Sequence, residues 1–454
     1  MLPVDDLTIG LFGIVLLVAL VLAGVRVFVA AALAGFVGLV LLRGWSTAIA
    51  IVGTIPHSKT VTYALSVLPL FILIGFLAFH AGFTKRLFET ARRWVGWVPG
   101  GLAVSTVFAS AGFAAVSGAS TATAAVFSRV AIPDMVKHGY HRRLTAGVVA
   151  AGGTLASLIP PSAILVIYAI IVEQSVGKLL LAGLLPGLVS VLIYTVLIIG
   201  MCTAKPQLGA SITGVSFKER IESLPGALPI LLVVGTIFGA LYTGFATPTE
   251  AGALGAAIIF LLYFGRSLLQ QSFSCFRENM FKALMETAKL TVMIFTLIWG
   301  VFIFVRFLGY AGLPSAFADW VVTLNVSPLV IMIGILLAYA ILGMFMDAIG
   351  MLILTLPVVF PAVIVLGYDP IWFGVIVVKM AEICLITPPI GLNCFVVAGV
   401  SRELQTPSGT SLNIPLQDVF RGVGPFFVAD VVTVAILLIF PDIVLWLPNT
   451  MADF

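Results

Sequence analysis

Apolar runs of roughly 20 residues, each long enough to cross a bilayer, recur along this chain between short polar stretches. This pattern predicts an all-α polytopic membrane protein. About ten spans are expected, at Leu7–Val25, Val27–Leu42, Val61–Phe79, Leu144–Ile171, Leu179–Met201, Ala227–Phe245, Thr247–Phe264, Leu284–Phe307, Ile371–Val400 and Val423–Leu447. Gly44–Thr60 is expected to be a polar-interrupted connection.

Two further apolar segments fit a re-entrant hairpin better than a simple crossing. Gly101–Ile132 has 32 residues, more than one crossing needs and too few for two. Its middle, Ser117–Thr123, is rich in weak helix formers, which favours two half-helices of about 15 residues, or ~22 Å each. Ser327–Leu366, interrupted at Gly343–Gly350, is the second hairpin candidate.

The segment Ala109–Tyr168 is repeated 228 positions later in the chain. The repeated residues are Pro133, Gly139–Tyr140 and Pro160–Pro161 in the first copy, and Pro361, Gly367–Tyr368 and Pro388–Pro389 in the second. A broken apolar pattern that occurs in both halves indicates a secondary transporter whose site lies where the breaks meet. Taken alone, a Pro-Pro pair could equally mark a kinked helix.

Basic residues orient the two copies. Lys85–Trp97 is predicted to be an amphipathic helix in the membrane interface, and Arg277–Lys282 a second interfacial stretch. Of 23 Lys and Arg residues, sixteen fall on one predicted side, which the positive-inside rule makes cytoplasmic. The exceptions are Arg43, Lys59, Lys178 and Arg306 outside, and Arg129, Lys289 and Lys379 within membrane segments. The repeats are then inverted, with one hairpin entering from each side and both termini outside.

Composition narrows the class of protein further. With 61% hydrophobic and 9% charged residues, the chain is far from a soluble domain, in which roughly 25% of residues are charged. Leu7–Val25, preceded by Asp5 and Asp6, is expected to be a retained span and not a signal peptide. The four cysteines do not have the spacing of a metal site. The sequence has no phosphate-binding loop of the kind that proteins use to hydrolyse ATP. We therefore expect neither an enzyme nor a nucleic-acid partner.

Several motifs resemble the large membrane subunit of tripartite ATP-independent periplasmic (TRAP) transporters, nearly from end to end of the chain. They are Val116–Ser120, Ile132–Tyr140, Ala150–Tyr168, Ala182–Gly187, Ala246–Gly252 and Ile386–Asn393. The resemblance implies a bacterial inner-membrane protein with an elevator-type fold, importing organic acids with sodium. It also implies two partners, a small four-helix membrane subunit and a periplasmic substrate-binding protein, besides membrane lipids and a small anionic substrate.

The repeat and the resemblance together predict a moving transport body within a scaffold. The expected organisation is scaffold spans and a first arm helix in 1–100, the first half of the body in 101–171, scaffold spans and a second arm helix in 172–326, the second half of the body in 327–400, and a C-terminal scaffold span in 401–454. Lys85–Trp97 and Arg277–Lys282 are the expected arms.

Breaks in membrane helices expose backbone oxygens, and sodium, a hard cation, takes oxygen ligands. No cofactor other than Na⁺ as coupling ion is expected. The sodium-binding candidates are Ser117, Ser120, Gly152, Leu155 and Pro160 in the first half and Gly343, Asp347, Thr387 and Ile390 in the second. An alternative interpretation of Ser117–Thr123 is a small-residue packing face.

The resemblance places substrate contacts at the first break and at the second hairpin. The candidates are Ser120, Thr154, Ser157 and Asp347. A carboxylate in mid-membrane is rare, so Asp347 is the strongest single candidate. Its structural alternative is a partner for a buried cation, for which Arg129 is eligible. Lys379 and Glu382, three residues apart, are expected to form an intrahelical pair.

Two other functions remain open on the sequence. One is a stand-alone sodium/carboxylate carrier of similar architecture. The other is a gated channel, which would need a continuous polar lining in place of polar groups clustered at two tips and two breaks. Sialic acids, four-carbon dicarboxylates, keto acids and ectoine suit the few hydroxyls equally, so the substrate is not predicted.

Overall fold

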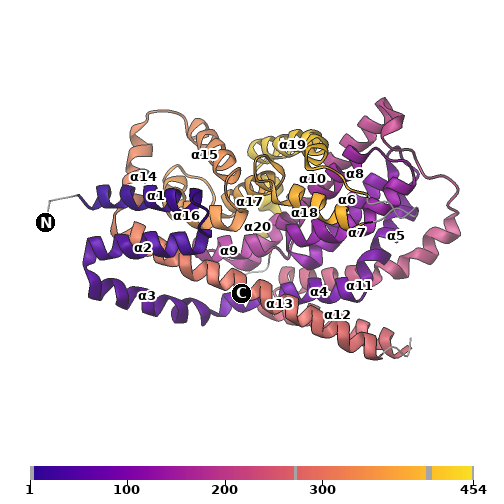
Figure 1. Ribbon diagram of the computed structural model, residues 1–454, viewed down its shortest axis with the longest axis horizontal. Helices are drawn as coiled ribbons and strands as arrows, with labels where there is room; N and C mark the ends of the chain where they lie inside the picture. The colour runs from indigo at the N-terminus through magenta and orange to yellow at the C-terminus, as the bar shows by residue number, and fades with distance from the viewer. Residues whose placement is uncertain (1–4, 270–272, 405–411, 452–454) are drawn as a thin grey trace.

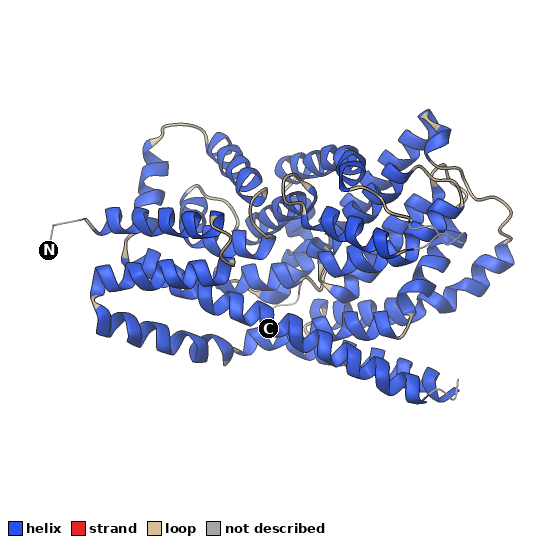
Figure 2. Ribbon diagram, in the orientation of Figure 1, coloured by secondary structure: helices blue, strands red, loops and turns tan. Residues whose placement is uncertain are grey.

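The computed structural model describes residues 5–269, 273–404 and 412–451, and every regular element in these ranges is a helix (Figure 2). Apolar runs without internal polar partners form helices in a membrane because only a helix satisfies all backbone groups within one segment. The prediction of an all-α polytopic membrane protein is confirmed.

Seven helices in the described ranges are long and apolar enough to cross a membrane, and a bent pair makes an eighth candidate. This number is lower than the ten spans that the sequence pattern predicts. The first two predicted spans, α1 (Asp6–Leu22) and α2 (Val27–Arg43), have 17 residues each, or about 25 Å, slightly less than a hydrocarbon core of about 30 Å. One helix of the seven, α16 (Ala348–Val365), is half of a predicted hairpin.

The first repeat copy consists of α6 (Gly101–Ser117), α7 (Ser120–Lys137), α8 (Arg142–Leu158) and α9 (Ala163–Ile171). Helices α6 and α7 form the predicted hairpin, and α8 and α9 the broken span, bent by 40°. Helix α7 ends at Lys137, two residues before Gly139, whose φ of +75° favours glycine, and the Tyr140 amide donates back to the Met135 carbonyl at 3.0 Å.

The second copy consists of α15 (Pro328–Gly343), α16, α17 (Pro370–Ile386) and α18 (Leu392–Glu403). Helices α16 and α17 begin and end 228 positions after α7 and α8, residue for residue. Gly367 again has a positive φ, and Tyr368 donates back to Val363. The Gly-Tyr pair in both copies therefore marks the same helix stop, and the sequence repeat is a structural repeat.

The remaining helices surround these two copies (Figure 1). They are α3 (Trp45–Thr60), the 3₁₀ turn η1 (Tyr63–Ser66), α4 (Val67–His80), α5 (Phe83–Val95), α10 (Val176–Ala204), the 3₁₀ turn η2 (Pro206–Leu208), α11 (Phe217–Tyr242), α12 (Pro248–Leu269), α13 (Phe273–Tyr310), α14 (Leu313–Thr323), α19 (Leu416–Ile439) and α20 (Asp442–Asn449). Helix α5 confirms the helix predicted over Lys85–Trp97.

Two sequence expectations differ from the structure in the type or extent of an element. Gly44–Thr60 is the helix α3 and not an irregular connection. Arg277–Lys282 is not a separate element, because it lies inside α13, which runs without a break for 38 residues. By the offset of the repeat, the counterpart of α5 is α14, whose only charged residue is Asp319. A search for basic clusters could not find it.

The predicted last span, Val423–Leu447, is also shifted. Helix α19 begins earlier, at Leu416, and ends at Ile439, and the short α20 follows it. At the centre of the molecule lie α8 and α17, which are buried along almost their whole length and pack against each other. The two breaks therefore flank a common core.

Candidate functional site

The tip of the first hairpin lies directly against the first break. The tip turns at Gly118, with φ +60°, and a Cβ there would lie 2.4 Å from the Pro161 carbonyl oxygen. The amide of Ala163 donates to the Gly118 carbonyl at 3.4 Å. Helix α8 ends just before Pro160 because Pro160 and Pro161 have no N–H to continue its ladder. The predicted meeting of tip and break is thus present in the first half.

Hydroxyl groups connect this tip to the broken span. Ser120, the first residue of α7, forms a hydrogen bond with Ser157 of α8 through their Oγ atoms. Ser117 Oγ lies 2.8 Å from Thr123 Oγ1. All four side chains are buried. The structure therefore brings together three of the predicted residues, Ser117, Ser120 and Ser157, at the tip and the break.

The backbone carbonyl groups predicted to bind sodium differ in whether their oxygens already accept a hydrogen bond. Gly152 lies within α8, and the Leu155 carbonyl already accepts the Ile159 amide at 2.9 Å, which leaves it one lone pair. Pro160 lies in the break itself. Thr154 lies three residues before Ser157 on α8 but has different partners: its hydroxyl donates to the Ala151 carbonyl at 2.7 Å and is within reach of Tyr194 on α10.

Two polar residues beside this cluster were not predicted. Ser110 Oγ and Asn393 Oδ1 are buried without a hydrogen-bond partner in the described part of the chain. A Cβ on Gly152 would lie 2.9 Å from Ser110 Oγ, and Asn393 Nδ2 donates to the Ala150 carbonyl at 3.1 Å. Asn393 comes from the second copy, so only a three-dimensional fold joins it to the first. The sequence signal that could have identified Asn393 is its position at the end of the motif Ile386–Asn393.

The second half is arranged differently. Asp347 is the N-cap of α16, accepting the Gly350 amide at 3.0 Å, and its side chain is half-buried. Gly343 ends α15 so close to α17 that a Cβ would overlap Cys384 Sγ. Thr387 caps α17 and donates to the Ile383 carbonyl, while Ile390 lies in the break. Among the described residues, no hydrogen bond joins this tip to its own break.

Arg129 and Lys379 form ion pairs that the sequence did not predict. Arg129 forms an ion pair with Glu403 at 3.5 Å, so the alternative pairing with Asp347 is wrong. Lys379 and Glu382 do form the predicted pair, at 2.8 Å, but Lys379 Nζ also lies 2.8 Å from Asp430 Oδ1 of α19. These three side chains are fully buried. No local spacing in the sequence links Asp430 to this pair, because Lys379 lies 51 positions away.

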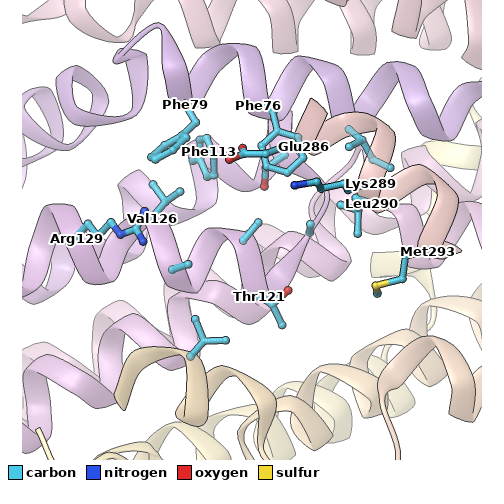
Figure 3. A pocket seen from close by; sticks show the side chains of 17 residues that line it. Phe76, Phe79, Phe113, Thr121, Val126, Arg129, Glu286, Lys289, Leu290 and Met293 are labelled. Atoms are coloured by element: carbon cyan, nitrogen blue, oxygen red, sulfur yellow. The ribbon is translucent and has the colours of Figure 1, made fainter. Parts of the chain in front are cut away.

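A cavity of about 520 Å³ opens beside the first tip (Figure 3). Its lining comes from α4 and α13 on one side and from α6, α7 and α18 on the other, and includes Ser117 and Thr121. Figure 3 shows Arg129 and Lys289 on opposite sides of the cavity. Its one carboxylate, Glu286, pairs with His80 at 3.0 Å. The cavity is thus mostly apolar with two cationic groups, a lining that suits an organic anion.

Comparison with known proteins assigns the family. The family model for the tripartite ATP-independent periplasmic transporter, DctM component, matches residues 14–443. The chain is 36% identical over 390 residues to a C4-dicarboxylate TRAP transporter large permease protein from Pseudomonas aeruginosa, covering 85% of this chain and 86% of that protein. It is 30% identical over 387 residues to a sialic acid TRAP transporter large permease protein from Vibrio cholerae, with coverages of 85% and 86%.

A solved structure supports the fold at a greater distance. The YdaH transporter of Alcanivorax borkumensis superposes with a TM-score of 0.56 at 16% identity, over 86% of this chain and 87% of that one. The resemblance seen in the motifs is confirmed by these matches. This chain belongs to the TRAP transporter family as a large permease subunit, a multi-pass protein of the inner membrane.

Proposed function

We propose that this permease moves a small carboxylate anion into the cell together with sodium ions. The observation that carries the proposal is the cluster of Ser117, Ser120 and Ser157, which lies between the first break and a cavity with two cationic groups. The names of the two relatives give C4-dicarboxylates and sialic acid as their substrates, and both are carboxylates. The cavity volume, about 520 Å³, is within the range of small-molecule sites.

Sodium fits the oxygens of the first half. A hard cation needs several oxygen ligands, which unwound carbonyls and hydroxyls supply. Ser117, Ser120 and the carbonyls of Gly152, Leu155 and Pro160 would hold one ion, and the unpartnered Ser110 Oγ faces the same place. A second ion would take Gly343, Asp347, Thr387 and Ile390, with Asp347 supplying the charge.

The substrate anion would reach the tip through the cavity. Among the described residues, Lys289 forms no ion pair, whereas Arg129 pairs with Glu403. A carboxylate between them would be stabilised by both charges. Ser120, Ser157 and Asp347 would then fix its orientation. Thr154, whose hydroxyl is engaged with the Ala151 carbonyl and Tyr194, would have to exchange these partners to bind the substrate.

Translocation would occur by sliding of a body against a scaffold. The body would comprise residues 101–171 and 327–400, but the packing supports adding α10 and α19. Asp430 of α19 and Ser190 of α10 share Lys379 of α17, and α8 and α19 touch backbone to backbone at Gly147 and Gly422. Breaking such buried contacts in each cycle would be costly. The scaffold would then be α1–α4 and α11–α13, with α5 and α14 as arms.

The family organisation supports two partners, a small four-helix membrane subunit and a periplasmic binding protein that delivers substrate. A stand-alone carrier is the second candidate, and the many large apolar side chains exposed on α11, α12 and α13 fit the lipid or a subunit equally. A gated channel is less well supported, because the polar groups cluster at the tips and breaks and do not form a continuous lining.

The test is uptake by proteoliposomes. Purified permease, with its small subunit, is reconstituted and given a panel of binding proteins loaded with labelled carboxylates. We expect uptake to follow an inward sodium gradient and to need no ATP. Equal uptake with potassium replacing sodium on both sides would refute sodium coupling. Strong uptake of free substrate by the single chain would favour the stand-alone carrier.

A further inference from the structure

Two arginines lie together where α4, α5 and α12 meet, at the predicted cytoplasmic end of these helices. Arg266 is in the last turn of α12 and Arg86 in the first turn of α5. They are close enough for their positive charges to repel each other. Among the described residues, neither guanidinium forms an ion pair. Two like charges held side by side are stabilised by an anion between them.

The guanidinium of Arg266 is fixed in position and still has unused N–H groups. Nη1 donates to the Ala81 carbonyl at the end of α4, at 3.1 Å, and the guanidinium carbon lies 6.0 Å from the ring centre of Phe83. Nε is buried without a hydrogen-bond partner. A guanidinium has five N–H donors in a planar fork, so further donors remain for the oxygens of an anion.

The carboxylates of these three helices do not supply that anion. Helix α4 has no acidic residue, and Glu250 of α12 lies at the opposite end of that helix. Glu89 of α5 pairs with Arg92 at 2.7 Å and with Arg93 at 3.3 Å. The side chain of Arg86 is exposed, so an anion from outside the chain can reach the pair.

The surroundings of the pair are those of a membrane interface. Helix α12 is long and apolar enough to cross a membrane, and Leu268 and Leu269, which follow Arg266, are 57% and 87% exposed. Trp94 and Trp97 of α5 are also exposed, and tryptophan is enriched at the level of the lipid headgroups. An anion that enters here comes with apolar chains beside it.

We propose that Arg86 and Arg266 bind the phosphate group of an anionic phospholipid in the cytoplasmic leaflet. Arginine suits this ligand because its fork can donate two hydrogen bonds to one phosphate. The bound lipid would join α5, the proposed first arm, to α4 and α12 of the proposed scaffold. The site is separate from the sodium and substrate candidates, and its occupancy does not depend on transport.

Lipid binding is measured on permease purified with its small subunit. Phosphatidylglycerol is titrated while native mass spectrometry counts bound lipids and tryptophan fluorescence reports thermal unfolding. We expect phosphatidylglycerol to bind and to raise the unfolding temperature, and phosphatidylcholine and inorganic phosphate at equal concentrations to do much less. Arg266→Gln should weaken phosphatidylglycerol binding roughly five- to tenfold, because one charge and its donors are lost. Arg266→Lys, which keeps the charge without the fork, should lie in between.

Lys85→Gln is the matched control, because Lys85 is the exposed neighbour of Arg86 and forms no ion pair among the described residues. It should weaken binding by about twofold or less, since it removes a charge outside the pair. Equal losses in Lys85→Gln and Arg266→Gln would indicate diffuse surface attraction and refute the site. Equal stabilisation by inorganic phosphate would refute a lipid as the ligand.

Two further measurements keep the test decisive. If Arg266→Gln folds poorly, Arg86→Gln replaces it, because no described hydrogen bond depends on the Arg86 side chain; full phosphatidylglycerol affinity in that variant would overturn the proposal. The single chain is titrated as well. If it binds phosphatidylglycerol and the complex with the small subunit does not, the pair serves the subunit interface and the lipid site is refuted.

Discussion

The two copies of the repeat have the same helices and different surroundings. In the first copy, Ile159–Ser162 of the break and both tip serines are buried. In the second copy, Pro388 and Pro389 are exposed, as is Phe345 at the tip. A duplicated backbone therefore does not make two equal sites. Which helices cover a break decides whether its oxygens are withheld from water.

Helix α10 covers the first break very closely. A Cβ on Gly183 would lie 2.3 Å from the Leu158 carbonyl, and one on Gly187 would lie 2.5 Å from Ile159 Cγ1. The second break is instead bordered by the ring of Phe420, near Gly391. The chemistry differs as well, since Ser120 and Ser157 correspond to Ala348 and Leu385. In the proposed sites, the first half would bind with neutral oxygens and the second with the charge of Asp347.

The largest effect is expected for Asp347→Asn. Asparagine is as good an N-cap as aspartate, so the helix stays, but the carboxylate charge is lost. Loss of a charged ligand group should reduce uptake by roughly 10- to 100-fold and raise the sodium concentration needed for half-maximal uptake. Sodium titration of uptake in proteoliposomes measures both.

Asp369→Asn is the matched control for Asp347→Asn. Asp369 caps α17, accepting the amides of Ile371 at 2.8 Å and Trp372 at 2.9 Å, but it is exposed and outside the candidate site. Its variant should transport like the wild type. An unchanged sodium dependence in Asp347→Asn would show that the second half works without its charge.

A smaller effect is expected in the first half, for Ser120→Ala. The change removes one neutral oxygen and leaves Ser157 without its partner, so uptake should fall by roughly two- to tenfold, with weaker sodium dependence. Ser128→Ala is the control, because Ser128 is also buried on α7 and bonds only the Ala124 carbonyl, at 2.7 Å. Equal losses in both variants would point to α7 stability and not to ion binding.

The smallest effect concerns sliding. A Cβ on Gly75 of α4 would lie 2.6 Å from the Ser117 Cα, so Gly75→Ala should wedge the scaffold against the first tip. We expect the maximal uptake rate to fall by a factor of about 3, with sodium affinity unchanged, because overpacking at this contact opposes the sliding movement. Gly53→Ala on α3, where a Cβ meets open space, is the control. Reduced sodium affinity in Gly75→Ala would place the effect at the ion site instead.

Much of this fold could be predicted from apolar periodicity and the repeat. The boundaries of α7 and α16 follow from Gly139 and Gly367, since each glycine supplies the positive φ that ends its helix. The continuity of α13 could not be predicted, because charges at Arg277 and Lys282 resemble an interfacial stretch whether or not the helix continues. Charge patterns show where water lies but not where a helix stops.

The site was only partly predictable for a similar reason. Serines at a weak-helix segment indicate a tip, and Ser120 does lie against Ser157. Asn393 and Asp430 were missed because their partners, Ala150 and Lys379, lie 243 and 51 positions away and no local spacing links them. The individual roles of the sodium and substrate candidates stay predictions until the variants above are measured.

The unbroken length of α13 has a consequence outside the site. At 38 residues it is about 57 Å long, nearly twice the hydrocarbon thickness of a bilayer. A tilt within the usual range cannot hide the excess, so part of the helix stands in the headgroup region or in water. Its basic end is joined rigidly to the part of α13 that lines the cavity. A change in bilayer thickness would therefore shift the height of Lys289 and of the cavity it lines relative to the membrane. If the anion enters as proposed, the chain length of the lipids would then influence its entry.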